Sequence, residues 1–204
     1  PFVGQGLCAG LRDAMNLSWK LAGVIKGGLA ADLLDTYQVE RKPHARKMIN
    51  LALTIGYAMT AGGRIGNALR SVVAPRARFI PGLGSRVLDS RTPPLSSSPL
   101  VQRGKRREQL AGTLCPNAVT ATGERLDDLV GNGFAVVTSV PPTTAQRNLI
   151  EQRNAFVHHA GRGSELAAWL DRGKAQAAIV RPDFTVMRAD PDLAELCEAL
   201  PTLG

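Results

Sequence analysis

The chain has 204 residues, of which 44% are hydrophobic, so it can bury the core of one or two domains. Its longest apolar run, residues 49–61, is interrupted by Asn50, Thr54 and Gly56, which makes it too short and too polar to cross a membrane. The chain opens on turn-forming residues and not on a charged and then apolar leader, so we expect no signal peptide.

The formal net charge of +8 is concentrated in one segment. Between Arg64 and Arg107 there are ten basic residues and a single acid, Asp89. Basic residues alone give only non-specific binding to nucleic acid, and no nucleic-acid-binding motif accompanies them. We therefore expect a solvated, arginine-rich connection and no nucleic-acid partner.

Three cysteines and three histidines are scattered along the chain, and no spacing among them is typical of a metal site or a disulfide framework. We therefore predict no metal site, a reducing cytoplasmic setting for the cysteines, and histidines at the surface or at strand ends. These residues are Cys8, Cys115, Cys197, His44, His158 and His159.

Residues 1–28 are the most informative stretch. Gly4 and Gly6 permit unusual backbone dihedrals in a turn, and apolar residues then repeat at helical spacing. The pattern predicts a mostly buried helix over residues 7–26 that ends at Gly27 and Gly28. The first turn of a helix carries unpaired N–H groups and partial positive charge. A glycine turn at this point can hold an anionic or electron-rich group, or it can simply precede a core helix. The expected apolar face consists of Leu7, Leu11, Ala14, Ser18, Leu21 and Ile25, widened by Met15, Trp19 and Ala22.

The string P-F-x-G-Q-G-L-C-x-G-x-R-D-A-x-N-L-x-W-K-L, residues 1–21, resembles the second flavin-contacting motif of the FAD-dependent aromatic hydroxylases. The form with Cys8 and Arg12-Asp13-Ala14 is most similar to that of the 3-(3-hydroxyphenyl)propionate hydroxylases. The resemblance implies an enzyme in which NADH or NADPH reduces FAD, and oxygen is then transferred to a phenol next to its hydroxyl group. The cofactor carries this chemistry, so no protein nucleophile or metal is required.

The resemblance also implies roles for single residues. Pro1 would lie on the substrate side of the flavin ring, near the place of oxygen transfer, and Gly4 and Gln5 would shape the turn. Asp13 and Asn16 match polar positions of the motif, and we expect them mainly to tie the helix to neighbouring loops.

The N–H groups of Gly6, Leu7 and Cys8 would face the pyrimidine end of the flavin and stabilise negative charge on the reduced ring. In the family, a dinucleotide-binding unit with the pattern G-x-G-x-x-G lies upstream, and this pattern is absent here. We therefore expect the chain to be the C-terminal part of a longer enzyme, inactive without its N-terminal FAD-binding half.

A second helix is predicted to be capped by Asp32, with a kink or a new start at Pro43. Residues 37–44, Y-Q-V-E-R-K-P-H, resemble the segment that follows the flavin motif in the same hydroxylases. We expect Glu40 to pair locally with Arg41 or His44. A shorter helix is predicted from about residue 65 to 73.

The rest of the chain changes character. Residues 92–99, T-P-P-L-S-S-S-P, are loop-forming by composition. We expect a helical part of an FAD-binding domain at 1–90, a basic linker at 91–108 and a C-terminal domain at 109–204. Within that domain, the patterns predict strands at 134–140, 155–158, 177–181 and 185–188. They predict helices at 143–152, at 164–170 and after Asp192.

This order of strands and helices is that of a thioredoxin-like domain, which the resembling hydroxylases carry at their C-terminus. Residues 180–183, V-R-P-D, are similar to the closing R-P-D segment of those enzymes. A working thioredoxin needs a thiol pair after its first strand, where this chain has S-V-P-P-T-T at 139–144. The predicted fold class is thus α+β, a helical segment followed by an α/β thioredoxin-like domain lacking CxxC. The role expected for that domain is packing or contact in a possible homo-oligomer.

Three functions stay open on these grounds. The first is part of a monooxygenase that ortho-hydroxylates a phenol such as 3-(3-hydroxyphenyl)propionate. The second is a non-catalytic thioredoxin-like dimerisation or interaction module with a helical arm. The third is a related oxygenase that acts on polyketides or antibiotics, against which Cys8 and Arg12-Asp13 favour the hydroxyphenylpropionate type.

Overall fold

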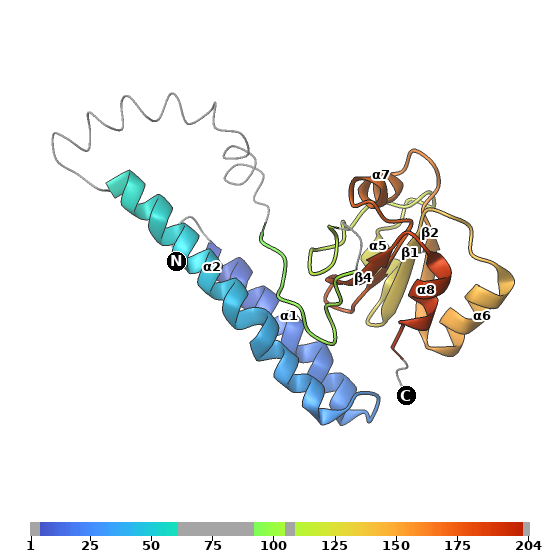
Figure 1. Ribbon diagram of the computed structural model, residues 1–204, viewed down its shortest axis with the longest axis horizontal. Helices are drawn as coiled ribbons and strands as arrows, with labels where there is room; N and C mark the ends of the chain where they lie inside the picture. The colour runs from blue at the N-terminus through green and yellow to red at the C-terminus, as the bar shows by residue number, and fades with distance from the viewer. Residues whose placement is uncertain (1–4, 61–91, 105–108, 202–204) are drawn as a thin grey trace.

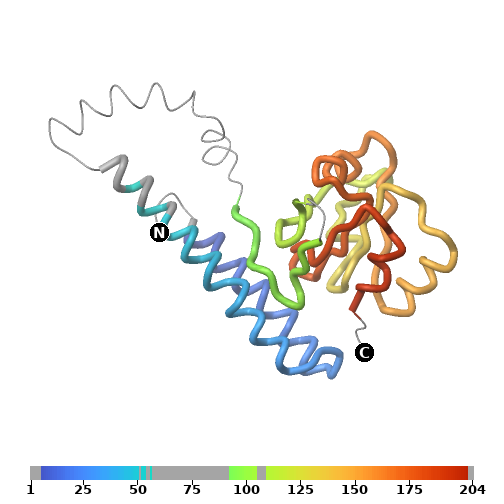
Figure 2. Tube along the Cα trace, viewed as in Figure 1, coloured from blue at the N-terminus to red at the C-terminus, as the bar shows by residue number. Residues whose placement is uncertain are grey.

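The computed structural model describes residues 5–60, 92–104 and 109–201. It contains a pair of long helices and a C-terminal α/β domain, and residues 92–104, drawn in green, run between the two (Figure 1). The tube in Figure 2 follows the same path, with the helix pair in blue and the C-terminal domain in yellow to red. This mixed α and β composition agrees with the predicted fold class.

The helix pair consists of α1 (Gln5–Ile25) and α2 (Asp35–Thr60), joined through the short 3-10 helix η1 (Ala31–Leu34). Asp32 lies inside η1 and does not cap α2, so this prediction was wrong. Pro43 neither ends α2 nor starts a new helix. Proline removes one backbone donor, and the carbonyl that would accept from it belongs to Val39, a half-exposed residue. The predicted helix at 65–73 lies outside the described residues.

The burial of α1 is the reverse of the prediction. Leu7, Leu11 and Ile25 on the apolar face are exposed, with 74%, 56% and 82% of their surface accessible. Its fully buried side chains are instead Asn16 and Lys20, which lie on the opposite face. The reason is that, in the part of the chain described, the C-terminal domain packs against the polar face.

The C-terminal domain is built on a four-stranded sheet. Its strands are β1 (Phe134–Thr138), β2 (Ala155–His159), β3 (Ala177–Val180) and β4 (Val186–Asp190), in the spatial order β2-β1-β3-β4. β1 is parallel to β2 and antiparallel to β3, and β3 is antiparallel to β4. All four strands match the predicted ones within three residues.

Helices cover both faces of this sheet (Figure 1). They are α5 (Leu126–Val130), α6 (Thr144–Gln152), α7 (Glu165–Arg172) and α8 (Leu193–Glu198). Because side chains alternate along a strand, Phe134 and Val136 pack with α6 and α8, whereas Ala135 and Val137 pack with α5 and α7. Three of the helices confirm the predictions; α5 is too short to give a periodic signal.

Residues 92–104 pack onto the C-terminal domain. Leu95, Leu100 and Val101 are buried, although these residues lie within the predicted linker. The N–H of Leu95 donates to the carbonyl of Gly112, and the N–H of Gln102 to that of Met187. This segment thereby fills the space between the helix pair and the sheet domain.

Candidate functional site

The first turn of α1 presents backbone donors at the surface. Gly6, Leu7 and Cys8 follow the first helical residue, Gln5, and all three are exposed. The N–H groups of a first turn have no acceptor within the helix, the helix dipole adds partial positive charge there, and this turn has no acidic residue. The geometry therefore suits an anionic or electron-rich ligand.

The other residues predicted from the motif fall into two groups. Pro1 and Gly4 lie outside the described residues. Asp13 and Asn16 lie on α1, two and three turns beyond its start, and their side chains contact other elements of the protein.

Asp13 joins α1 to α2. Its Oδ1 accepts a hydrogen bond from Nε of Arg41 at 2.5 Å, and Nη2 of Arg41 donates to the carbonyl of Ala9 at 3.3 Å. Nη1 of Arg41 lies 3.1 Å from Nδ1 of His44. Arg41 thus pairs with α1, and the predicted local ion pair between Glu40 and Arg41 or His44 is wrong.

His44 is buried, with 3% of its surface exposed, and does not lie at the surface as predicted. Burial and the positive charges of Arg41 and Arg12 lower the pKa of His44 to about 4, against the opposing effects of Asp13 and of a hydrogen bond to the carbonyl of Pro93. At neutral pH the ring is uncharged, so one nitrogen accepts from Arg41 while the ring donates to Pro93.

Asn16 lies between the two helices and the C-terminal domain. Its Nδ2 donates to Oε2 of Glu40 at 2.9 Å and to Oδ2 of Asp183 at 3.1 Å. Its Oδ1 accepts from Nζ of Lys20 at 2.9 Å, and the same ammonium lies 3.0 Å from Oε2 of Glu40. Asn16 therefore ties α1 to α2 and to the turn after β3.

Arg181, at the end of β3, completes this arrangement from the C-terminal domain. Its Nη1 donates to both carboxylate oxygens of Glu40 at 3.0 and 3.1 Å, and to the carbonyl of Leu100 at 3.1 Å. Its Nε and Nη2 donate to Asp183 at 3.0 and 2.5 Å. Ser98 adds a hydroxyl donor to Oε1 of Glu40 at 2.6 Å. We call the central five residues the buried polar cluster: Asn16, Lys20, Glu40, Arg181 and Asp183.

The charges of the buried polar cluster balance, with two cations and two carboxylates. Burial acts to raise the pKa of Glu40 and Asp183, but the charge of Arg181 outweighs it, with help from Lys20 at Glu40, so both carboxyl pKa values lie below the usual range. Burial lowers the pKa of Arg181, yet Asp183 and Glu40 outweigh it and raise that pKa. Both carboxylates are therefore ionised at neutral pH.

Trp19 packs beside the cluster. Its ring meets the ring of Phe134 edge to face, with 5.6 Å between centroids, and the guanidinium of Arg181 lies 5.3 Å from the Trp19 centroid. A cation over an indole face is attracted by the ring quadrupole. The contact between the rings of Trp19 and Phe134 links α1 to β1.

The sequence gives only part of this site. Asn16 belongs to the flavin motif, and residues 180–183 resemble a family segment. No sequence pattern indicates that Asn16 contacts Asp183, which lies 167 positions further along the chain. One signal was available, because Asn16 and Lys20 are four residues apart and share the helix face opposite the apolar one.

Among the described residues, no group of three or more His, Cys, Asp or Glu side chains is placed to hold a metal ion. No helix in those ranges is long and apolar enough to pass through a bilayer.

Comparison with known proteins matches residues 1–52 to a family model described as an FAD binding domain. The 3-(3-hydroxy-phenyl)propionate/3-hydroxycinnamic acid hydroxylase of Burkholderia cenocepacia is 34% identical over 90% of this chain, and the same-named protein of Mycolicibacterium gilvum is 40% identical over 66%. The chain spans about 40% of the length of the first of these relatives and 25% of the second.

Solved structures of related fold cover nearly the whole chain. RebC-10x, soaked with chromopyrrolic acid and with bound 7-carboxy-K252c, aligns with 98% of this chain and 42% of its own, with a TM-score of 0.66 and 21% identity. The anhydrotetracycline hydroxylase OxyS of Streptomyces rimosus aligns with 98% of this chain and 41% of its own, with a TM-score of 0.64 and 25% identity.

The match of residues 1–52 to an FAD-binding domain and the similarity to the named hydroxylases confirm the resemblance to the FAD-dependent aromatic hydroxylases that the motif in residues 1–21 predicts. The names of the two relatives agree with the type that the form of the motif predicts, the 3-(3-hydroxyphenyl)propionate hydroxylases.

Proposed function

We propose that the chain is part of a monooxygenase that uses FAD, NADH or NADPH, and oxygen to hydroxylate a phenol such as 3-(3-hydroxyphenyl)propionate next to its hydroxyl group. The observation that carries this proposal is the 34% identity, over 90% of this chain, to a hydroxylase named for that substrate. The exposed first turn of α1, within the segment matched to an FAD-binding domain, supports it.

The residues at that turn fit a flavin. Bound FAD would supply the redox chemistry. Gly6, Leu7 and Cys8 would donate their N–H groups to its pyrimidine end and stabilise negative charge there, because fixed donors stabilise developing charge without reorganising. Gly4 and Gln5 would shape the turn, and Pro1 would border the substrate.

Asp13 and Asn16 would act as positioning residues. Their side chains are engaged by Arg41 and by the buried polar cluster, so they would hold α1 in place instead of contacting the flavin. The orientation of the first turn would then depend on the C-terminal domain through Glu40 and Arg181.

We infer further that the C-terminal domain, 109–204, is thioredoxin-like. The strand order β2-β1-β3-β4, with β1 and β2 parallel and the other pairs antiparallel, supports this assignment. The segment between β1 and α6 has no cysteine, so dithiol chemistry is impossible there. Packing or subunit contact is the role we propose for it.

The test begins with the coding sequence upstream of Pro1. An open frame with G-x-G-x-x-G after a strand-forming run is expected. The protein it encodes, including this chain, is then purified, and its FAD content, NADH oxidation and oxygen uptake are measured with 3-(3-hydroxyphenyl)propionate. Mass spectrometry is expected to find one added oxygen atom. Absence of bound FAD or of substrate-dependent turnover would overturn the proposal in favour of an interaction module.

A single donor can be removed to test the role of the turn. Gly6→Pro deletes one N–H in a first turn, where proline is tolerated. We expect at least about tenfold weaker FAD binding, because a hydrogen bond to a charged group is worth about 1.5–3 kcal/mol. Gly10→Ala, which fills open space, is the matched control. Equal FAD affinity in both variants would exclude Gly6 as a flavin contact.

A further inference from the structure

The turn that leads into β1 has the sequence Gly131-Asn132-Gly133, and it is the one place in the chain where asparagine is followed directly by glycine. Gly131 ends α5 with a φ of 61°, and its N–H donates to the carbonyl of Asp127. Asn132 is exposed, whereas Phe134, the first residue of β1, is fully buried. A surface asparagine therefore stands two residues before a strand of the core.

The side chain of Asn132 and the backbone nitrogen of Gly133 are both unengaged. Within residues 5–60, 92–104 and 109–201, neither the Asn132 amide nor the Gly133 N–H forms a hydrogen bond. By contrast, Asn117 accepts at its Oδ1 from the N–H of Asp127 at 3.1 Å. A hydrogen-bonded group is held in place by its partner, whereas the side chain of Asn132 is free to approach the nitrogen that follows it.

Glycine on both sides of Asn132 makes that approach easier. A residue without a Cβ adopts a wider range of backbone dihedrals than any other and lets neighbouring atoms come close. At Gly133 no side chain stands beside the backbone nitrogen, so the nitrogen is open to attack the Asn132 carboxamide. Exposure, absence of hydrogen bonds and the following glycine thus coincide at one asparagine.

We propose that Asn132 is a site of spontaneous deamidation in the folded chain. The N–H of Gly133 loses its proton to hydroxide, and the nitrogen attacks Cγ of Asn132. The bond from Cγ to Nδ2 breaks, and ammonia leaves after taking a proton from water, which regenerates hydroxide. Water then opens the resulting succinimide at either carbonyl and yields aspartate or isoaspartate. Nothing is oxidised or reduced, and the step does not depend on the proposed oxygenase function.

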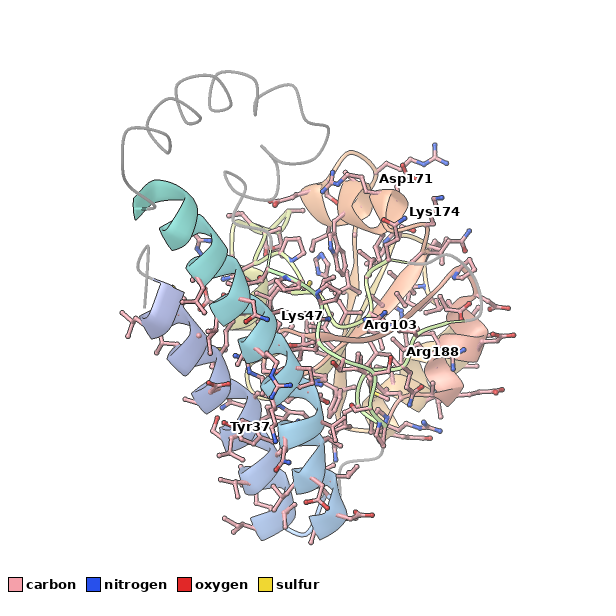
Figure 3. All side chains as sticks on the ribbon, turned by 60° about the vertical axis from the view of Figure 1, so that its left-hand side comes forward. Tyr37, Lys47, Arg103, Asp171, Lys174 and Arg188 are labelled. Atoms are coloured by element: carbon pink, nitrogen blue, oxygen red, sulfur yellow. The ribbon has the colours of Figure 1, made fainter. Side chains whose placement is uncertain are left out.

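The modification would act on the junction between the helix pair and the C-terminal domain. Asn132 borders a groove that Trp19, Lys26 and Pro182 also line, and Figure 3 shows the side chains of both parts at this junction. Both products carry a carboxylate in place of a neutral amide. Isoaspartate also adds one carbon to the backbone before Phe134, whose ring meets that of Trp19 at 5.6 Å between centroids. Because interiors are close-packed, the isoaspartyl form should shift this contact.

The test incubates the folded 204-residue chain at mildly alkaline pH and follows each asparagine by peptide mapping and mass spectrometry. Asn132 should convert at least about tenfold faster than Asn117, Asn148 and Asn154, because each of these is followed by a residue with a Cβ. The rate should rise with pH, because the attacking nitrogen must lose its proton. Enzymatic methylation of isoaspartate with a labelled methyl group should mark the same peptide.

Gly133→Ala is the variant that separates the following glycine from the rest of the turn. A Cβ at Gly133 would lie 3.5 Å from the carbonyl oxygen of Asn154, an ordinary contact, and Gly133 is not at positive φ. The fold should therefore be kept, and conversion of Asn132 should slow at least about tenfold because the methyl group hinders ring closure. Gly161→Ala, which fills open space before α7, is the matched control and should leave the rate unchanged.

Circular dichroism checks that each variant is folded, and Asn132→Gln covers the case in which Gly133→Ala is not. It keeps an amide but requires a larger ring, so conversion at this position should be lost. The proposal is overturned if Asn132 in the folded chain converts no faster than the other three asparagines. It is also overturned by an unchanged rate in folded Gly133→Ala, or by conversion that occurs only after the chain is unfolded in urea.

Discussion

Glu40 receives hydrogen bonds from four side chains, which come from three different parts of the chain. Asn16 and Lys20 lie on α1, Ser98 on the connecting segment and Arg181 at the end of β3. Burying charges costs several kcal/mol per ion, so a paired cluster adds little net stability. Removing one partner, however, leaves an uncompensated buried charge. The cluster therefore selects the one packing of α1 in which all of its members are satisfied.

The buried imidazole of His44 makes stability depend on pH. Because its pKa is about 4 in the folded chain and about 6.5 when unfolded, the unfolded state binds more protons between these values. The free energy of unfolding should therefore fall as the pH is lowered from 6.5 towards 4, by up to about 1.4 kcal/mol per pH unit. Urea denaturation at a series of pH values measures this slope.

His44→Gln should flatten that slope, because an amide can still accept from Arg41 and donate to Pro93 without titrating. Glu40 and Asp183, whose pKa values are lowered, lose their contribution only as the pH falls below about 4.5. Between pH 6.5 and 5, the slope of the free energy of unfolding therefore reports the titration of histidine and not that of these carboxylates. His158→Gln, on β2, measures the share of the slope that comes from the other histidine whose pKa burial lowers. An identical slope for His44→Gln and the parent chain would contradict the assignment.

At the scale of elements, strands and helices followed from local pattern. β1 and α7 could be predicted because hydrophobic runs and capping residues such as Ser164 act within a few residues of chain. The burial of α1 could not, since it depends on which face meets the C-terminal domain. The sequence shows an apolar face and no sign that Lys20, on the other face, finds partners on α2.

The turn at Gly112 joins the connecting segment to the C-terminal domain. Gly112 has a φ of +81°, and a Cβ there would lie 2.8 Å from the carbonyl oxygen of Leu95. Gly112→Ala should therefore lower the free energy of unfolding by about 3 kcal/mol or more, because strain at positive φ and overpacking both destabilise the folded chain. Chemical denaturation gives this value.

Gly123→Ala separates the two effects. Gly123 has a φ of +86°, but a Cβ there meets nothing within 4 Å. We expect a loss of about 1–2 kcal/mol, which is the conformational cost alone. An equal loss of stability in the two variants would show that the close approach of the new Cβ to Leu95 does not destabilise the folded chain.

At the scale of the molecule, the helix pair and the sheet domain meet through contacts between residues far apart in sequence. Glu40 and Arg181 are 141 positions apart. The first turn of α1 could be proposed as a flavin contact from the motif, whereas the buried polar cluster required the fold. Resemblance identified Y-x-x-E-R and R-P-D as separate segments, and only their packing makes them one structural unit.

We expect the two parts to unfold together. Native-state hydrogen exchange should give the same opening free energy for the central amides of α1, α2 and β1. Glu40→Gln leaves Lys20 and Arg181 undercompensated, so it should cost about 3–5 kcal/mol and make the helix pair exchange faster than the sheet. Glu151→Gln, at an exposed position, is the control. Unchanged exchange in Glu40→Gln would mean that the cluster does not couple the two parts.

The distribution of the three thiols has a practical consequence. Cys115 and Cys197 are buried, and burial raises the pKa of both thiols, that of Cys115 to about 12. Cys8 is exposed in the first turn of α1. Since only an accessible thiolate attacks an electrophile, a maleimide fluorophore should label Cys8 selectively in the folded chain. The native sequence thus carries its own attachment point for an optical reporter, at the turn where the cofactor is proposed to bind.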